Sequence, residues 1–391
     1  MLTAALLLGS TLALPAEFGL TERQDNCTVA STFAAVDVPK LNDPFTFYDG
    51  RKVATKADFT CRQQEISKIL QQYELGDFPG PPDKVEASMS GSTLNVKVTV
   101  GTKSVTISAA IRKGSTSPGP AIITVGGASL PIPGTVSTVA FGNDAFASQA
   151  SGSSRGQGAF YTLFGNTHSA GALTAWAWGV GRIIDGLEQL GAATTGIDPK
   201  RLGVTGCSRN GKGAFVVGAL NDRIALTLPQ ESGSGGAACW RISDQQKNAG
   251  ANIQTAGEIV GENVWFSSRF NSYTSKITTM PEDHHLLAGL VAPRGLFVME
   301  NDIDWLGPVA TTGCMKAGRL IYKALGAPDA MGFDLTGGHS HCQFPSSSQA
   351  ALTGYINTYL LGQGTPPTGI EKSSATVNMA DWVDWTPPTL T

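Results

Sequence analysis

The chain has 391 residues, a formal net charge of −3, and charged side chains at 15% of its positions. Charged residues make up roughly 25% of an average soluble domain, so this surface carries little charge. No block of lysine and arginine stands out, which argues against nucleic acid or an anionic membrane as a partner and favours an uncharged substrate. The length is ample for a substantial hydrophobic core.

The N-terminal end carries an apolar run at residues 2–14. This run is too short to span a bilayer but has the length of the hydrophobic region of a secretory signal. We therefore expect residues 1–16 to be a signal-like segment and residues 17–391 to form a single secreted domain, which we expect to be a monomer. The sequence Asn-Cys-Thr that begins at Asn26 matches the acceptor pattern for N-linked glycosylation.

Apolar spacing predicts helices over residues 63–73 and 172–190. Two stretches with alternating apolar residues, 90–100 and 104–111, predict an antiparallel hairpin at the edge of a sheet. Short stretches rich in apolar residues predict further strands, at residues 120–125, 202–206, 224–228, 296–299 and 331–335. Because strands alternate with helices, we expect an α/β fold with a mostly parallel central sheet covered on both faces. The proline-rich tail from residue 362 onward is expected to wrap the body as a loop.

The strand at 202–206 leads through Cys207 onto Ser208 and directly into a helix. In α/β-hydrolases, a serine on such an elbow between strand and helix is the nucleophile, and its usual pattern is Gly-x-Ser-x-Gly. Here Asn210 takes the last position of that pattern, and the glycine follows at Gly211. The elbow predicts an esterase of the α/β-hydrolase fold, and the alternative is that Ser208 only caps the helix.

Two cations, Arg209 and Lys212, fall in the first turn of this helix, where the helix dipole disfavours positive charge. We expect them to face oxygen atoms of a substrate, or the oxyanion that forms when Ser208 attacks a carbonyl. The alternative is two long side chains that reach solvent. The residues 126–128 follow an earlier strand, and such a loop often supplies a second oxyanion N–H group in this fold.

A serine nucleophile needs a base, which in this fold follows the last strand. His339 and His341 lie there, in a glycine-rich loop. Six cysteines predict three disulfides. If Ser208 and His341 form a catalytic pair, their neighbours Cys207 and Cys342 come within disulfide range. We therefore predict a bond between these two cysteines and favour His341 as the base.

The four remaining cysteines pair most economically in chain order, as Cys27–Cys61 and Cys239–Cys314. Two histidines beside a cysteine also suggest a metal site, but the sequence offers no fourth ligand, so we expect no metal.

The base in turn needs an acid to hold its tautomer, and carboxylates follow two of the expected strands. Glu231 comes shortly after the strand at 224–228, whereas Asp302 and Asp304 follow the strand at 296–299. Many α/β-hydrolases carry their acid at the later position, so spacing alone favours Asp302 or Asp304.

Residues 204–212, Val-Thr-Gly-Cys-Ser-Arg-Asn-Gly-Lys, closely resemble the Gly-Cys-Ser-Arg-Asn-Gly-Lys signature of fungal glucuronoyl esterases, carbohydrate esterase family 15. The resemblance extends to Gln-Glu-Ser-Gly at 230–233, to the histidine loop at 337–342 and to all six cysteine positions. This family cleaves esters that join glucuronic acid on xylan, often 4-O-methylated, to alcohols of lignin. The resemblance therefore implies a glucuronoxylan–lignin ester as the substrate.

Position by position, the resemblance makes Ser208 the nucleophile, His341 the base and Glu231 the acid, and it places Arg209 by the oxyanion. It also implies sugar contacts at four positions, which are Lys212, Gln254, Glu262 and Trp305. Some relatives use an acid at the later strand end, so Asp302 and Asp304 remain alternatives. No metal or organic cofactor is expected. The rival hypotheses are an acetyl or feruloyl esterase on the same fold and a secreted carbohydrate-binding protein that no longer catalyses.

Overall fold

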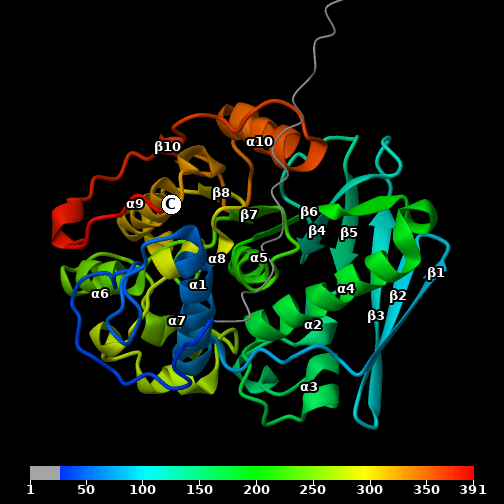
Figure 1. Ribbon diagram of the computed structural model, residues 1–391, viewed down its shortest axis with the longest axis horizontal. Coiled ribbons are helices and arrows are strands. Elements are labelled where there is room, and N and C mark those ends of the chain that lie inside the picture. Colours follow the sequence, from blue (N-terminus) through cyan, green and yellow to red (C-terminus); the bar gives the residue numbers. More distant parts are fainter. Residues whose placement is uncertain (1–26) are drawn as a thin grey trace, which may run out of the picture.

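The computed structural model describes residues 27–391. The expected signal-like segment at 1–16 and the glycosylation acceptor Asn26 lie outside the described residues. Within them, a ten-stranded sheet crosses the molecule (Figure 1). In spatial order its strands are β1 (Lys84–Ser90), β2 (Thr93–Val100), β3 (Lys103–Arg112), β5 (Ser137–Phe141), β4 (Gly119–Val125), β6 (Ile197–Cys207), β7 (Leu226–Gln230), β8 (Gly295–Glu300), β9 (Met331–Leu335) and β10 (Glu371–Lys372).

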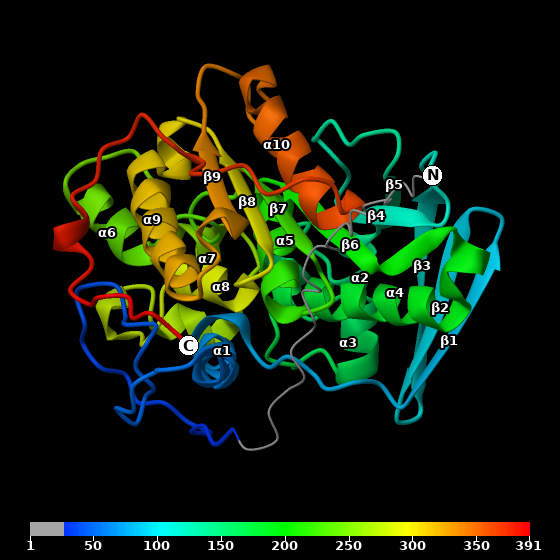
Figure 2. The same ribbon diagram turned by 45° about the horizontal axis from the view of Figure 1, so that its top comes forward.

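The sheet is antiparallel from β1 through β3 to β5 and parallel from β5 to β10. Its helices are α1 (Lys56–Leu70), α2 (Asn143–Phe146), α3 (Ala159–Phe164), α4 (Ala172–Thr195), α5 (Arg209–Leu220), α6 (Trp240–Asn248), α7 (Ala256–Glu262), α8 (His285–Val291), α9 (Pro308–Ala324) and α10 (Gln349–Ile356). Helices α4, α5 and α8 cover one face of the sheet, and α10 lies on the opposite face (Figure 2). The expected α/β fold with a mainly parallel sheet is confirmed.

Strands β4, β7, β8 and β9 are buried at every position, which explains why apolar residues predominate in them and do not alternate with exposed polar ones. The expected antiparallel hairpin is confirmed as β2 paired with β3, but β1 lies outside it and is the edge strand of the sheet. The sequence pattern did not predict β1, which has no fully buried position, or the short strand β5. An exposed or short strand leaves only a weak hydrophobic pattern.

The first predicted helix, at residues 63–73, differs from the structure at both ends. Helix α1 begins earlier because Thr55 and Asp58 form a capping box, in which each side chain accepts from the other residue's backbone N–H. It ends at Leu70 and continues as a π-helical turn at Gln71–Leu75. The tail from residue 362 onward is mostly irregular, as expected, and it packs on the N-terminal segment through the Trp385 Nε1–Leu41 O hydrogen bond of 2.9 Å.

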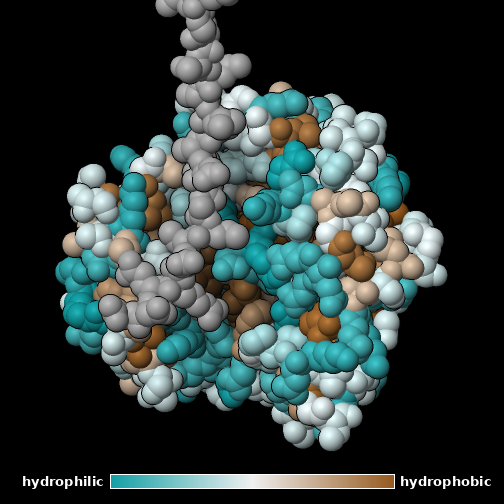
Figure 3. Space-filling model, turned by 45° about the vertical axis from the view of Figure 1, so that its right-hand side comes forward, coloured by the Kyte–Doolittle hydropathy of each residue, from teal (hydrophilic) through white to brown (hydrophobic). Residues whose placement is uncertain are grey.

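Three disulfides join Cys27 to Cys61, Cys207 to Cys342 and Cys239 to Cys314, which are the pairs expected from the sequence. Hydrophilic and weakly polar residues cover most of the face in Figure 3, where strongly hydrophobic residues form small separate patches. Among residues 27–391, no helix combines the length and the apolar character that a membrane crossing requires.

Parallel strands place their carboxyl ends at one edge of a sheet, and that edge carries the chain segments singled out above. Residues 126–128 follow β4, Ser208 follows β6, Glu231 follows β7, and the histidine loop follows β9. The topology therefore gathers the proposed nucleophile, acid and base from separate parts of the sequence.

Helix α5 packs closely on β7 because Gly218 lacks a side chain. A Cβ atom at Gly218 would lie 2.1 Å from Thr227 Oγ1 and 2.8 Å from Thr227 Cβ. We expect Gly218→Ala to lower the free energy of unfolding by about 1–3 kcal/mol, the usual cost of overpacking a core. Urea denaturation followed by circular dichroism would measure it.

The matched control is Gly257→Ala in helix α7, where a Cβ atom would have no neighbour within 4 Å. This change should leave stability the same or raise it by about 0.4–1 kcal/mol, since alanine narrows the unfolded ensemble. Equal effects of the two substitutions would contradict the close contact between α5 and β7.

Candidate active site

Ser208 sits on a strained elbow between strand β6 and helix α5. Its backbone φ is +59°, which is unusual for a residue other than glycine. A Cβ atom at Gly206 would lie 2.3 Å from Asn210 O, and one at Gly211 would lie 2.4 Å from Gln230 O. Only glycine fits at these two positions, so the sequence forces the sharp turn that presents the serine.

Asn210, which replaces the usual glycine of the elbow pattern, has a structural role of its own. Its Oδ1 accepts hydrogen bonds from Asn143 Nδ2 at 3.1 Å and from Gln149 Nε2 at 3.2 Å. On its other side, the amide lies against Gly126, where a Cβ atom would approach Asn210 Nδ2 to 2.0 Å. The asparagine therefore binds the elbow to Asn143 and Gln149 and packs against Gly126.

Glu231 follows β7 directly and is the carboxylate that binds His341. Its side chain is buried, and Oε2 lies 2.6 Å from His341 Nδ1 and accepts from the Cys342 backbone N–H at 3.0 Å. Asn301 Nδ2 donates to the same oxygen at 3.3 Å. A carboxylate held by several donors keeps a fixed direction, which orients the imidazole ring.

The Cys207–Cys342 disulfide places His341 near Ser208, since each bonded cysteine is adjacent to one of these residues. The Cα atoms of the two cysteines are 5.9 Å apart. His341 Nε2, the ring nitrogen that does not face Glu231, has no hydrogen-bond partner among the described residues. The Trp305 ring packs edge-on against the imidazole, with 4.9 Å between centroids. His341 can therefore accept a proton at Nε2.

His339, the other histidine of the loop, is committed to structural contacts. Its Nε2 lies 2.7 Å from Thr336 O, and its Nδ1 is 3.8 Å from Glu231 Oε1. Asn301 holds the same segment through a hydrogen bond of 3.2 Å to His339 O. The structure thus assigns the free imidazole nitrogen to His341.

The alternative acids lie elsewhere in the site. Asp302 Oδ1 accepts from Gly338 N at 3.3 Å, and its carboxyl group fills the space beside Gly337. Asp304 is exposed and begins the short 3₁₀ turn Asp304–Leu306. Asp302 therefore supports the backbone of the histidine loop, while Glu231 bonds the imidazole.

Lys212 does not reach solvent. Its side chain is 5% exposed, and Nζ donates to Ser232 O at 2.5 Å. Burial lowers the pKa of Lys212 to about 8, an effect that the nearby carboxylates Glu300 and Glu262 oppose and the Arg209 guanidinium reinforces. The lysine is therefore a buried cation whose charge changes in mildly alkaline solution.

Trp265 lies beside both cations of the first helical turn. Its ring centroid is 5.9 Å from Arg209 Cζ and 5.8 Å from Lys212 Nζ. The indole Nε1 donates to Gln149 Oε1 at 2.8 Å, which connects the tryptophan to the network around Asn210. Nothing in the sequence indicated this role for Trp265, because a tryptophan far along the chain from the elbow carries no local signal.

The remaining expected sugar-binding residues also lie together. Gln254 Nε2 donates to Glu262 Oε2 at 3.1 Å, and the Gln254 backbone N–H donates to Trp305 O at 3.3 Å. Glu262 ends helix α7 and is exposed. Glu262 also acts electrostatically on Lys212, and Trp305 packs against His341. The four residues that the resemblance links to the sugar therefore lie in one region beside His341.

Within the described residues, no group of three or more histidine, cysteine or carboxylate side chains is arranged to hold a metal ion.

The mainly parallel sheet and the serine on its strand–helix elbow define the chain as an α/β-hydrolase. Residues 96–326 match the family model described as glucuronyl esterase of fungi. A 4-O-methyl-glucuronoyl methylesterase of Thermothelomyces thermophilus is 64% identical over 387 residues, covering 98% of this chain and 97% of the relative. One from Neurospora crassa is 63% identical over 394 residues, covering 100% and 99%. The chain therefore belongs to the fungal glucuronoyl esterase family, whose members are carboxylic ester hydrolases.

Solved structures agree with this assignment. The crystal structure of the Sporotrichum thermophile glucuronoyl esterase has a TM-score of 0.92 and 64% identity, and it covers 93% of this chain and 100% of its own. A serine-to-alanine mutant of that enzyme, in complex with methyl 4-O-methyl-β-D-glucopyranuronate, also has a TM-score of 0.92 and 64% identity, covering 94% and 100%. The Hypocrea jecorina catalytic domain has a TM-score of 0.91 and 52% identity, covering 93% and 100%.

The geometry predicts that the Cys207–Cys342 disulfide serves both stability and activity. It closes a loop of 135 residues, so replacing both cysteines by serine should lower the free energy of unfolding by about 3–5 kcal/mol. Since His341 would also lose its tether, kcat on a uronate ester should fall at least about tenfold at temperatures where the variant is folded. Denaturation curves and initial rates would measure the two effects.

The control is Cys27→Ser with Cys61→Ser, which removes a disulfide that closes 34 residues at the start of the described chain. This double variant should have a lower free energy of unfolding than the parent enzyme. Its kcat should stay within about twofold of the parent value, because this disulfide does not join segments of the site. A similar loss of kcat in both double variants would contradict the proposed role of the Cys207–Cys342 bond.

Proposed function

We propose that the chain hydrolyses ester bonds between (4-O-methyl-)D-glucuronic acid of glucuronoxylan and lignin alcohols, with Ser208, His341 and Glu231 as its catalytic triad. The observation that carries this proposal is the joining of the serine elbow to the histidine loop, with Glu231 Oε2 at 2.6 Å from His341 Nδ1. The uronate ester bound by the Sporotrichum thermophile relative supports the substrate class.

In the proposed reaction, Ser208 Oγ attacks the ester carbonyl carbon while its proton passes to His341 Nε2. Glu231 accepts the Nδ1–H hydrogen bond and stabilises the imidazolium that forms. As the tetrahedral intermediate collapses, the carbon–oxygen bond to the alcohol breaks, and the imidazolium returns its proton to the leaving oxygen. Water then gives a proton to His341, attacks the acyl-enzyme and releases the uronic acid and Ser208.

The negative oxygen of the intermediate needs donors placed before the reaction begins. Arg209 is the first residue of helix α5, so its backbone N–H has no partner within the helix and can face this oxygen. We propose that the Arg209 guanidinium, which lies near Trp265, supplies a second favourable interaction.

The sugar ring would occupy the region formed by Lys212, Gln254, Glu262 and Trp305. The indole of Trp305 offers an apolar surface for a pyranose ring, and the other three side chains offer donors and acceptors for its hydroxyl groups. An ester carries no charge at the reacting carboxyl group, so Lys212 suits a hydroxyl or carbonyl oxygen better than an anion. Buried polar groups left unpaired would penalise sugars that lack matching hydroxyls.

We further propose that residues 17–391 act as one catalytic domain, that residues 1–16 direct secretion, and that the enzyme works as a monomer. The disulfides of the described chain support an oxidising, extracellular setting.

Purified enzyme assayed on methyl D-glucuronate, methyl D-galacturonate and an acetyl ester tests the proposed substrate class. We expect kcat/KM for the glucuronate ester to exceed that for the galacturonate ester at least about tenfold, because the epimeric 4-hydroxyl misaligns its hydrogen bonds. Ser208→Ala should lose at least about a thousandfold in kcat, which controls for contaminating esterases. A preference for the acetyl ester would instead favour an acetyl or feruloyl esterase.

A second prediction concerns the pH dependence of binding through Lys212. Its pKa is lowered to about 8, so the ammonium group carries its charge below that pH and loses it above. Since a charged donor binds oxygen more strongly than a neutral amine, KM for methyl glucuronate should rise about threefold to tenfold between about pH 7 and about pH 9. Steady-state kinetics across this range would show the change.

Lys212→Met provides the comparison, because methionine has similar length and cannot titrate. Its KM should be high at both ends of the range and nearly independent of pH. If this variant keeps the KM of the parent enzyme, or shows the same rise, Lys212 does not contact the sugar.

A further inference from the structure

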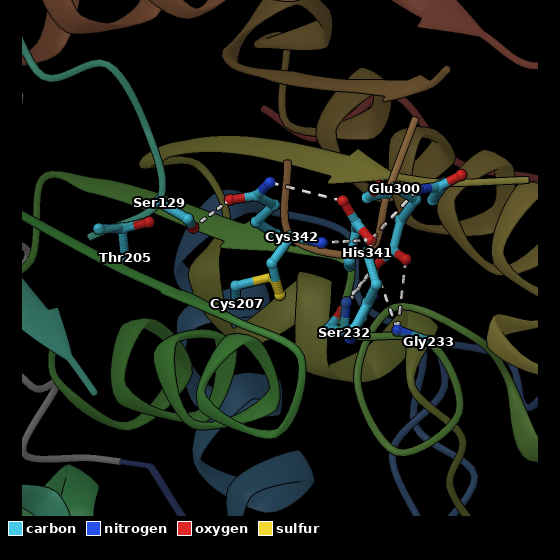
Figure 4. The surroundings of a disulfide bond; sticks show 12 residues. Ser129, Thr205, Cys207, Ser232, Gly233, Glu300, His341 and Cys342 are labelled. Atoms are coloured by element: carbon cyan, nitrogen blue, oxygen red, sulfur yellow. Dashed lines mark hydrogen bonds and ion pairs between the residues drawn. A yellow bond between two sulfur atoms is a disulfide. The ribbon is translucent and has the colours of Figure 1, made fainter. Parts of the chain in front are cut away.

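A second buried carboxylate, Glu300, lies at the end of β8 next to the strand that carries Glu231. Its side chain points toward the turn formed by Ser232 and Gly233 (Figure 4). Oε1 accepts hydrogen bonds from Ser232 N at 2.8 Å, Ser232 Oγ at 2.7 Å and Gly233 N at 3.2 Å. Glu300 is 3% exposed, so these protein donors replace the water that a carboxylate needs.

The turn needs these contacts because its backbone is unusual. Glu231 has a φ of +44°, a left-handed conformation that costs free energy for a residue with a side chain. The next two N–H groups are buried, and a buried donor without an acceptor costs about 1–3 kcal/mol. Glu300 satisfies both and thereby stabilises the turn that follows directly after Glu231.

The peptide group between Ser232 and Gly233 is also bound at its carbonyl oxygen. Lys212 Nζ donates to Ser232 O at 2.5 Å, while Gly233 N, the other polar atom of that peptide, donates to Glu300. A buried cation and a buried carboxylate therefore bind opposite ends of one peptide dipole. Glu231 and Lys212 are the charged groups that act on Glu300 from the neighbouring elements.

We propose that Glu300 is a positioning residue that aims the proposed catalytic acid: by fixing the peptide between Ser232 and Gly233, with Lys212 on the opposite edge, it keeps Glu231 directed at His341 Nδ1. This role rests on the triad proposed above. It links the residue expected to bind sugar, Lys212, to the acid of the triad through a single peptide unit.

The test compares Glu300→Leu with Glu300→Gln. Leucine leaves all three donors without an acceptor, so kcat on methyl glucuronate at saturating substrate should fall about 10- to 100-fold. Glutamine keeps an acceptor oxygen at the Oε1 position, which binds all three donors, so it should recover kcat to within about threefold of the parent enzyme.

Proton NMR supplies a readout that a purely structural role would not change. A hydrogen bond between an imidazole Nδ1–H and a carboxylate gives a proton resonance far downfield of the amide region. This signal should be present in the parent enzyme and in Glu300→Gln, and it should be lost or broadened in Glu300→Leu. Glu231→Gln identifies the signal, because it removes the carboxylate itself.

The matched control is Glu65→Leu, which removes a buried carboxylate far from the turn. Glu65 is 1% exposed in helix α1, where it pairs with Arg62 at 2.5 Å and accepts from Tyr48 N at 3.0 Å. This variant should lower the melting temperature and leave kcat and the downfield signal unchanged. If Glu300→Leu does not fold, Ser232→Ala removes one donor to Glu300 and should lower kcat about threefold to tenfold.

The proposal is overturned if folded Glu300→Leu keeps kcat within twofold of the parent enzyme, if Glu300→Gln loses as much activity as leucine, or if Ser232→Ala is fully active. Failure of the proposed function would look different. In that case the parent enzyme itself would not cleave methyl glucuronate, or Glu231→Gln would retain its activity.

Discussion

The disulfide between Cys207 and Cys342 is the constraint on which the site depends. Strands β6 and β9 are separated in the sheet by β7 and β8, so three strand spacings of about 4.8 Å, roughly 14 Å in all, lie between them. The Cα atoms of the two cysteines are nevertheless 5.9 Å apart. The histidine loop must therefore cross back over the ends of two strands, and the disulfide holds it beside the serine elbow.

This crossing explains why Glu231, the proposed acid, is the residue that directly follows β7. A loop that returns from β9 to β6 passes over the end of β7, where both His341 Nδ1 and the Cys342 N–H reach Glu231 Oε2. The carboxylates that follow β8 have other partners, since Glu300 binds the turn at Ser232 and Asp302 binds Gly338. Spacing along the chain favoured the later strand because spacing does not reveal the path of a loop.

The sequence allowed much of the architecture to be predicted, because fully buried strands such as β4 are mostly apolar runs bounded by glycine. The disulfide next to the active site also followed from residue order, since Cys207 and Cys342 each adjoin a residue of the Ser–His pair. What the sequence could not show depends on contacts between distant segments. Lys212 lies beside Trp265, 53 positions along the chain, and Glu300 binds Ser232, which is 68 positions away.

Asn210 is the one departure from the usual Gly-x-Ser-x-Gly pattern of the elbow, and its contacts with distant segments explain it. A glycine at position 210 would allow the strand and helix to approach but would leave the donors of Asn143 and Gln149 without this acceptor. Asn210 accepts from both, and Gln149 in turn accepts from the Trp265 indole. Because Trp265 faces the cations of the first helical turn, hydrogen bonds from Asn210 through Gln149 connect the serine elbow to the residue beside those cations. The elbow therefore has an asparagine at position 210 and retains glycine at Gly206 and Gly211, where a Cβ atom would clash with backbone oxygens.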